Sequence, residues 1–294
     1  MAAKQKFGST HTEYKLGKLD EYLKAYTTAL KKRGFRLVFF DAFAGTGDIQ
    51  IGGETPLLGA VDDYSPFIEG SAVRALQCGA AFQRYVFVEK SKSKARDLRD
   101  KLIAKFPTFQ DRIDIHQGDA NEELLDFCAR TDWKKTRAVV FLDPQGNQVK
   151  WKTIEAIART NAIDLWYLFP AGLGVHRQIG RDGKVHFSHG ASLDDLFGTS
   201  EWRHNFIEEQ DGADLFERRT DRLKVATPLS ITLFMIERMR EIFKGGVLDE
   251  WSPLGSRGIH MYSLLFAWAN PSENAKLAGK LARAVLRSAR RGRS

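Results

Sequence analysis

The chain has 294 residues, of which 43% are hydrophobic and 28% are charged. This is an ordinary globular composition, and it excludes disorder, collagen and coiled coil as descriptions of the whole chain. The longest apolar runs, 163–170 and 261–269, are shorter than the roughly 20 residues that span a bilayer, so no membrane association is expected. The N-terminus has no apolar core of signal-peptide length, and Cys78 and Cys128 stand alone. These features predict a cytoplasmic protein without structural disulfides.

The net charge of +8 is concentrated at the two ends of the chain. Residues 1–36 carry +6, residues 275–294 carry seven basic residues and no acid, and the middle of the chain carries −5. In 275–294 the apolar and the basic residues each recur every three or four positions, which is typical of a basic amphipathic helix. Two interpretations remain open: an arm that binds nucleic-acid phosphates, or a solvated C-terminal helix.

In chain order, the sequence first predicts a helix over 14–33. Five short runs rich in Val, Ile, Leu, Phe and Tyr are predicted strands: 35–42, 84–89, 112–117, 137–143 and 163–169. Amphipathic stretches between them are predicted helices: 71–78, 93–106, 121–130 and 150–160. This alternation predicts an α/β fold, with a mostly parallel, doubly wound sheet covered on both faces.

The pattern changes in the last third of the chain. Residues 188–223 are polar and helix-prone, 229–243 predicts a helix, and 258–269 predicts a late strand. No linker or repeat is visible, so we expect one domain over 35–274, preceded by a helical extension over 1–34 and followed by the basic helix and tail over 275–294. A helical insertion at about 171–225 is a candidate lid.

Open α/β sheets bind ligands at the carboxyl ends of their strands, so the residues that end the predicted strands are candidates for a site. The first strand ends in Asp41 and continues into Gly45 and Gly47, which allow a tight turn and a close approach to a ligand. The segment lacks the Lys-Ser/Thr of a phosphate loop and the third glycine of a dinucleotide motif. A plain strand-to-helix turn is therefore the alternative.

Three further strand ends carry acids: Glu89, Asp119 and Asp143. A carboxylate at the first of these positions can accept hydrogen bonds from both hydroxyls of a ribose. Asp119 follows a tight turn and is suited to an adenine amino group. Each acid alone is more often a helix cap or a solvated turn residue, but four strand-end acids in this order favour a nucleotide-like ligand.

These residues resemble the class I S-adenosylmethionine-dependent methyltransferases, and more closely the bacterial family of three-Cys-motif partner proteins. The shared segments are 22–26, 39–45, 69–76, 87–89, 141–144 with Trp151, and 270–271, so the likeness covers most of 11–275. It implies a Rossmann-like class I methyltransferase fold with a late antiparallel strand, and S-adenosylmethionine as the cofactor.

The resemblance also implies roles for individual residues. The glycines would line the methionine part of the cofactor, Asp41 would hold its amino group directly or through water, and Glu89 would hold the ribose hydroxyls. Asp119 would hold the adenine amino group. The full set of expected cofactor-binding residues is Asp41, Phe43, Gly45, Gly47, Glu89, Asp119 and Ala120.

The catalytic corner is expected at Asp143, Pro144 and Gln145. Methyl transfer from a sulfonium mainly requires alignment, and the Asp143 carboxylate with the Pro144 carbonyl can accept the two N–H groups of an exocyclic amine. Enzymes that methylate base amines generally have a second proline and an aromatic where this chain has Gln145 and Gly146, so stacking of a flipped base is not predicted. Neither cysteine follows a proline, which argues against cytosine C5 chemistry.

Other chemistry-bearing residues have simpler interpretations. His176, His186 and His189 lack the accompanying ligands of a zinc site and are expected to be exposed loop residues, so no metal is predicted. Trp166 and Tyr167 are expected in the core.

Two functions remain. The first is an S-adenosylmethionine-dependent methyltransferase acting on nucleic acid or a nucleotide-derived group. The second is a cofactor-binding, catalytically weak or inactive subunit that associates with a Cys-motif partner protein, which the family resemblance implies.

Overall fold

The computed structural model describes residues 9–45, 71–77, 79, 82–212, 219–255 and 259–291; the side chains of 9–18, 210–221 and 288–291 are outside this description. The first half alternates helices and strands: α1 (Ser9–Leu30), β1 (Arg36–Asp41), α3 (Ser71–Gln77), β2 (Arg84–Glu89), α4 (Lys92–Lys105), η1 (Pro107–Arg112), β3 (Ile113–Gln117), α5 (Ala120–Arg130), β4 (Thr136–Leu142), α6 (Trp151–Arg159) and β5 (Ile163–Phe169). The strands and helices predicted up to Phe169 are thus present, with ends displaced by a few residues at most for all but the first helix.

The second half is more varied: η2 (Ala171–His176), α7 (Phe187–Phe197), α8 (Trp202–Phe206), β6 (Ile207–Gly212), β7 (Arg219–Lys224), α9 (Pro228–Ile242), β8 (Gly246–Val247), β9 (Ser252–Leu254), β10 (Tyr262–Trp268), η3 (Glu273–Ala275) and α10 (Lys276–Arg291).

The main sheet has the strand order β3-β2-β1-β4-β5-β10-β8, with β9 paired to β10. The strands β1 to β5 run parallel, whereas β10 pairs antiparallel with β5, from Ser263 opposite Phe169 to Trp268 opposite Asp164. The chain therefore has the expected Rossmann-like α/β fold of the class I methyltransferases, including the late antiparallel strand. The order reverses at β1, whose neighbours are β2 and β4, and this switch point is where such sheets bind ligands.

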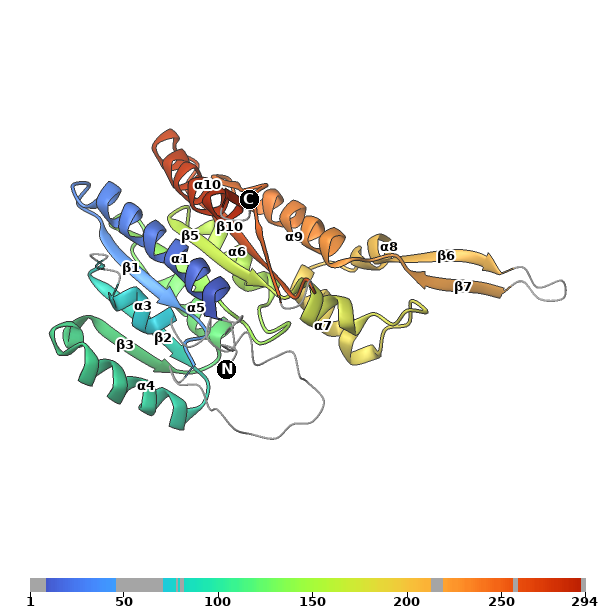
Figure 1. The fold of residues 1–294 in the computed structure, drawn as a ribbon, viewed down its shortest axis with the longest axis horizontal. Helices are drawn as coiled ribbons and strands as arrows, with labels where there is room; N and C mark the ends of the chain where they lie inside the picture. Colours follow the sequence, from blue (N-terminus) through green and yellow to red (C-terminus); the bar gives the residue numbers. More distant parts are fainter. Residues whose placement is uncertain are drawn as a thin grey trace, which may run out of the picture.

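Helices cover both faces of the sheet because the central strands are apolar on both sides (Figure 1). Within β1, Val38 and Phe40 face one core while Leu37 and Phe39 face the other. The first core includes residues of α5, α6, α7 and α9, and the second includes residues of α1, α3, α4 and α10.

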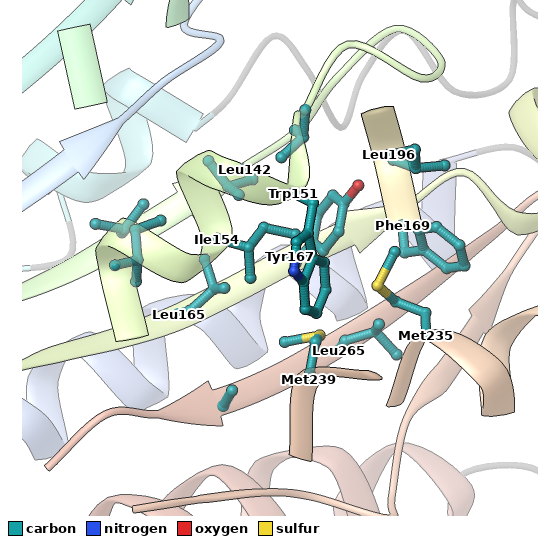
Figure 2. Close-up of a cluster of buried hydrophobic side chains, with 14 of the residues drawn as sticks. Leu142, Trp151, Ile154, Leu165, Tyr167, Phe169, Leu196, Met235, Met239 and Leu265 are labelled. Atoms are coloured by element: carbon teal, nitrogen blue, oxygen red, sulfur yellow. The ribbon is translucent and has the colours of Figure 1, made fainter. Parts of the chain in front are cut away.

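Figure 2 shows part of the first core, where side chains of α6, α7, α9, β4, β5 and β10 converge around Trp151. Tyr167 lies in this cluster, and Trp166 points into the opposite core, where its ring centroid is 4.8 Å from that of Phe266. Both residues are fully buried, as expected. The cluster joins the loop that follows β4 to the helices of the second half of the chain.

The segment expected to be helical up to Leu223 is helical only through Phe206. The chain then forms the hairpin β6–β7, a separate two-stranded sheet that projects from the body of the molecule (Figure 1). The helix prediction rested on residues such as Glu, Gln, Arg and Leu, which favour helices when nothing else decides. In this segment cross-strand pairing favours strands instead. Glu209 and Arg222 face each other across β6 and β7 and form an ion pair at 2.9 Å.

The basic helix α10 packs against the body of the molecule. Ala282, Val285 and Leu286 are buried in the core that also holds residues of α1. Two of its arginines are bound to one acid, since Arg283 Nε lies 3.0 Å from Glu250 Oε2 and Arg287 Nε lies 3.1 Å from Glu250 Oε1. Apolar docking and this ion-pair cluster fix the helix.

Candidate functional site

A cavity of about 410 Å³ lies where the first four strands end. Its wall is formed by the segment after β1, by the β2–α4 and β3–α5 turns, by the loop after β4, and by α7. The lining residues are Ala42, Phe43, Gly45, Glu89, Lys90, Lys94, Gly118, Asp119, Ala120, Asn121, Asp143, Gln145, Asn147, Gln148, Lys150, Ser192 and Asp195. Its position at the switch point follows from the strand order.

Most of the residues singled out from the sequence meet in this cavity. Those on its wall are Phe43, Gly45, Glu89, Asp119, Ala120, Asp143 and Gln145. Asp41 and Pro144 are not on the wall; Asp41 is fully buried at the end of β1. Gly47 lies outside the described residues. The strand ends are thus brought together, while the roles assigned to them remain predictions.

The turn after β1 brings the backbone to the cavity. Gly45 has φ of 63°, a conformation that favours glycine because a Cβ would clash there. Just before it, the Ala42 amide donates to Phe141 and the Ala44 amide donates to Val88, so both neighbouring strands hold this segment. The close approach expected for Gly45 therefore has a physical basis.

Asp41 and Asp143 form a buried acidic pair beneath the cavity. Burial raises the pKa of Asp41 to about 6, although hydrogen bonds from Ser71 and from the Phe43 amide, at 3.1 Å, oppose the rise. Burial, with the nearby charge of Asp41, raises the pKa of Asp143 well above its ordinary value. Asp41 Oδ2 and both carboxyl oxygens of Asp143 are buried and have no hydrogen-bond partner in the described structure. Three unsatisfied oxygens are costly, and they match a ligand that brings N–H donors or positive charge.

The two acids on the other side of the cavity are already partly engaged. Glu89 Oε1 accepts the Ser91 amide at 2.8 Å. Asp119 caps α5, since its Oδ1 accepts the Asn121 amide at 3.0 Å. Desolvation tends to raise the pKa of Asp119, but the bonds from Asn121 and the Lys90 ammonium outweigh it, and the pKa lies below its ordinary value. Asp119 is therefore a carboxylate at neutral pH.

Asn121 holds the loop after β4 against the start of α5. Its Nδ2 donates to the Gln148 carbonyl at 2.9 Å, and its Oδ1 accepts both the Lys150 amide and the Thr153 hydroxyl at 2.9 Å. Inside the loop, the Gln145 amide donates to Gln148 Oε1 at 2.9 Å. The loop that carries the proposed catalytic corner is therefore fixed by side-chain amides.

Several wall residues were not singled out from the sequence. Lys90, Asn121 and the residues after Gln145 directly follow strand-end positions, so the same logic extended by a few residues finds them. Ser192 and Asp195 come from α7, where no motif marks them. Asp195 also lies 3.7 Å from the Lys150 ammonium, so α7 is joined to the loop after β4 at the rim of the cavity.

The histidines do not form a ligand cluster. His186 caps α7 by accepting the Ser188 amide, and both His186 and His189 are exposed. Throughout the described residues, no group of three His, Cys, Asp or Glu side chains is arranged to hold a metal ion. Among the same residues, no helix has the length and apolar character to cross a bilayer.

Comparisons with known proteins give only distant similarity. No protein-family model matches the chain, and no curated protein matches its sequence. A solved structure of a Legionella pneumophila protein aligns with 14% identity and TM-score 0.46, covering 96% of this chain and 92% of that one. A putative methyltransferase from Escherichia coli aligns with 12% identity and TM-score 0.30, covering 70% and 86%. An O-methyltransferase from Bacillus cereus in complex with SAH aligns with 11% identity and TM-score 0.36, covering 85% and 80%. The assignment of function therefore depends on the site itself.

Proposed function

We propose that this chain is an S-adenosylmethionine-dependent methyltransferase that acts on an amino group of nucleic acid or of a nucleotide-derived molecule. The observation that carries the proposal is the cavity at the ends of β1 to β4, in which Glu89, Asp119 and Asp143 meet. Asp143 is buried with both oxygens unpaired, a state that a bound amine relieves.

The residues present fit the cofactor. Glu89 is suited to the ribose hydroxyls and Asp119 to the adenine amino group, because both residues lie on the cavity wall at the ends of neighbouring strands. Gly45 leaves room beside the backbone for the methionine part, and the unpaired Asp41 Oδ2 is suited to its ammonium, through water since Asp41 is not on the wall.

When bound, the cofactor supplies an electrophilic methyl group on a sulfonium. The chain's own contribution is to hold the acceptor amine, with Asp143, which lies on the cavity wall, accepting an N–H bond and directing the lone pair at the methyl carbon. Methylation of the amine would release one proton from its nitrogen, and Asp143 is placed to accept it in its ionised form. Because burial raises the pKa of Asp143, methyl transfer should increase as the pH rises through that raised value.

The rim of the cavity favours a polar acceptor, and Lys94 is its ammonium group that is not paired with Asp119 or Asp195. Lys90, Lys94 and Lys150 lie on the wall together with the amide side chains of Asn147 and Gln148. Ammonium groups bind phosphates, and amides match the donor and acceptor pattern of nucleobase edges. Phe43 is the single aromatic on the described wall, so recognition by amides takes the place of base stacking in this proposal.

Calorimetric titration of S-adenosylmethionine and S-adenosylhomocysteine into the purified protein is the first test. We expect binding by the wild type, a loss of roughly 10-fold or more in Glu89→Ala and Asp41→Ala, and no change in Glu122→Gln, an exposed acid at the start of α5. Asp143→Ala should keep cofactor affinity and lose methyl transfer to DNA, RNA or nucleotides. Full turnover by Asp143→Ala would refute the catalytic assignment.

The basic termini are proposed to add affinity for nucleic acid. In the described part of α10, Arg283 and Arg287 are held by Glu250 and Lys276 by Glu273, so Lys280 is the basic residue without an acidic partner. Replacing Lys276 and Lys280 by Gln leaves the buried face of α10 intact. If both contact phosphates, the slope of log affinity against log salt falls by about 2 on duplex DNA. An unchanged slope would remove α10 from the interface.

A partner subunit is the second candidate, favoured by the loop after Asp143-Pro144. Gln145 and Gly146 stand where base-amine methyltransferases generally have proline and an aromatic, and the three-Cys-motif resemblance implies a Cys-motif partner protein. Cofactor binding without turnover on any nucleic acid, together with a stable complex isolated with such a partner, would support this candidate over the enzyme.

A further inference from the structure

A second cavity, of about 180 Å³, lies at the opposite edge of the sheet from the candidate site. It is bounded by the C-terminal end of α1, the amino ends of β4 and β5, and the start of α10. Its lining residues are Tyr26, Ala29, Leu30, Arg33, Phe35, Arg137, Ala162, Asp164, Asn270, Ser272, Asn274, Ala275, Leu277, Ala278 and Leu281. Asp164 and Phe169, at the two ends of β5, are about 17 Å apart along the strand, so the two cavities are separate.

A buried carboxylate faces this cavity with one oxygen free. Asp164 is 6% exposed, and its Oδ2 accepts the Tyr22 hydroxyl at 2.7 Å. Its Oδ1 has no hydrogen bond among the described residues, and it is not one of the sealed, unpaired atoms of the core. The free oxygen therefore opens onto the cavity and can accept a bond from a ligand.

A cation lies on the same wall without touching that carboxylate. Arg137 Nη1 donates to the carbonyls of Trp133 and Thr136 at 2.7 Å, and its guanidinium lies 4.0 Å from the centroid of the Phe35 ring. Its Nε and Nη2 make no hydrogen bond in the described structure. Burial raises the pKa of Asp164 and the positive charge of Arg137 opposes the rise, yet among the described residues no ion pair joins the two side chains. Opposite charges thus face one small space from separate positions.

The remaining wall is largely apolar. Leu30, Leu277 and Leu281 line it, and Leu277 is 46% exposed at the start of α10. A volume of 180 Å³ corresponds to about six waters, or to a ligand of roughly six to nine non-hydrogen atoms. The ligand of this cavity must therefore be small. It must offer a donor to the Asp164 oxygen, an acceptor to Arg137 and an apolar part to the leucines.

We propose that this cavity binds a small zwitterion with an apolar side chain, such as a free aliphatic α-amino acid. The ligand's ammonium bonds Asp164 Oδ1, its carboxylate bonds the free nitrogens of Arg137, and its side chain lies against the leucines. The ammonium meets a buried carboxylate and the carboxylate meets a half-buried guanidinium, and charge-assisted hydrogen bonds of this kind are stronger than neutral ones. This site is independent of the function proposed above.

Calorimetric titration with three matched probes tests the charge requirement. L-leucine carries both charges, isoamylamine lacks the carboxylate, and isocaproate lacks the ammonium. We expect L-leucine to bind and each truncated probe to bind at least about 10-fold more weakly, the effect of one lost charge-assisted bond. Absence of L-leucine binding at millimolar concentration, or equal binding of all three probes, would overturn the proposal.

Two substitutions locate the binding in this cavity. Asp164→Asn keeps an acceptor for the Tyr22 hydroxyl and removes the negative charge. It should weaken the binding of L-leucine by roughly 10- to 100-fold. Ala278→Met fills the cavity from α10 without changing charge, and it should abolish binding even if Asp164→Asn fails to fold. The exposed Asp182→Asn is the control. Unchanged L-leucine affinity in Ala278→Met would place the ligand elsewhere and refute the site.

The pH dependence provides a further readout. Burial raises the pKa of Asp164 to about 7, although Tyr22 and Arg137 oppose the rise. Burial raises the pKa values of Tyr22 and Tyr26 well above their ordinary value, so of these three groups Asp164 is the one that titrates near neutrality. L-leucine affinity should therefore rise as the pH increases through about 7 and then level off. A flat profile would exclude Asp164 as the ammonium acceptor.

Discussion

Asp143 illustrates how a proposed catalytic residue lowers stability. Its carboxyl is buried without a hydrogen-bond partner, next to Asp41, and its pKa is raised. A folded-state pKa above the unfolded value means that the folded state holds the proton more tightly. The contribution to stability is therefore fully present below the unfolded pKa of about 3.8 and is lost as the pH rises through the folded value.

We therefore expect the free energy of unfolding to decrease as the pH rises above about 3.8 toward the raised pKa of Asp143, by up to about 1.4 kcal/mol per pH unit for this proton. Asp143→Ala should flatten this slope and be at least as stable as the wild type at pH near 8, because an unpaired buried carboxylate is removed. Urea denaturation over this pH range measures both the pH slope and the relative stability of the two proteins. Asp182→Asn should leave the slope unchanged, since the pKa of Asp182 lies below its usual value and outside this range. An unaltered slope in Asp143→Ala would contradict the expectation.

In contrast to Asp143, the side chain of Asn121 has a hydrogen-bond partner for both of its polar atoms. Asn121→Ala removes four side-chain hydrogen bonds: those from Nδ2 to Asp119 Oδ1 and to the Gln148 carbonyl, and those that Oδ1 accepts from the Lys150 amide and the Thr153 hydroxyl. We expect a loss of about 2–4 kcal/mol in unfolding free energy, measured by urea denaturation, together with weaker cofactor binding. Asn205→Ala is a matched control on an exposed surface and should change stability by less than about 0.5 kcal/mol.

At the scale of elements, Gly198 sets how α7 meets the site. It ends α7 with φ of 66°, and a Cβ there would overlap the indole of Trp151, the first residue of α6. Gly34 has φ of 70° as well, but a Cβ there meets nothing within 4 Å. The two glycines share a backbone conformation and differ in their neighbours.

Gly198→Ala should therefore destabilise the protein by at least about 2 kcal/mol, while Gly34→Ala should cost only about 1 kcal/mol for the backbone conformation. The difference between the two variants in a denaturant titration isolates the contact with Trp151. If both variants lost the same unfolding free energy, α7 would be able to move away from Trp151 without cost. It would then not position the rim of the cavity.

Elements whose pattern depends on neighbouring sequence were predictable, and those that depend on tertiary contacts were not. The five parallel strands were found because they are continuous apolar runs with polar ends, and the same ends supplied most of the cavity wall. The hairpin β6–β7 was missed because its strands are polar on both faces and are fixed by cross-strand pairing. Ser192 and Asp195 were missed because only the packing of α7 against α6 brings them to the site.

At the scale of the whole molecule, the hairpin β6–β7 extends away from a body that is otherwise built on one sheet (Figure 1). Its attachment is at its base, where Lys224 Nζ donates to the carbonyls of His176 and Ile179 at 2.8 and 3.1 Å. Among the hairpin side chains that the structure describes, Ile207 at the base is the one that packs against a core. Removal of the distal part of the hairpin should therefore leave the body intact.

Replacing 209–222 by Asn-Gly, a two-residue turn between the paired residues Glu208 and Leu223, tests this expectation. Unfolding free energy should change by less than about 1 kcal/mol, because the apolar cores are untouched. Calorimetry should show unchanged cofactor affinity. A larger loss of stability would mean that the distal hairpin shields part of the body.

The position of β10 between β5 and β8 has a consequence for synthesis. The parallel strands β1 to β5 can pair once the chain up to Phe169 has emerged from the ribosome, but the free edge of β5 is covered only when Tyr262–Trp268 arrives. At about 5–20 residues per second, this apolar edge stays open for on the order of ten seconds, long enough to meet another nascent chain. Prematurely terminated chains that end before β10 keep the edge permanently and are expected to aggregate.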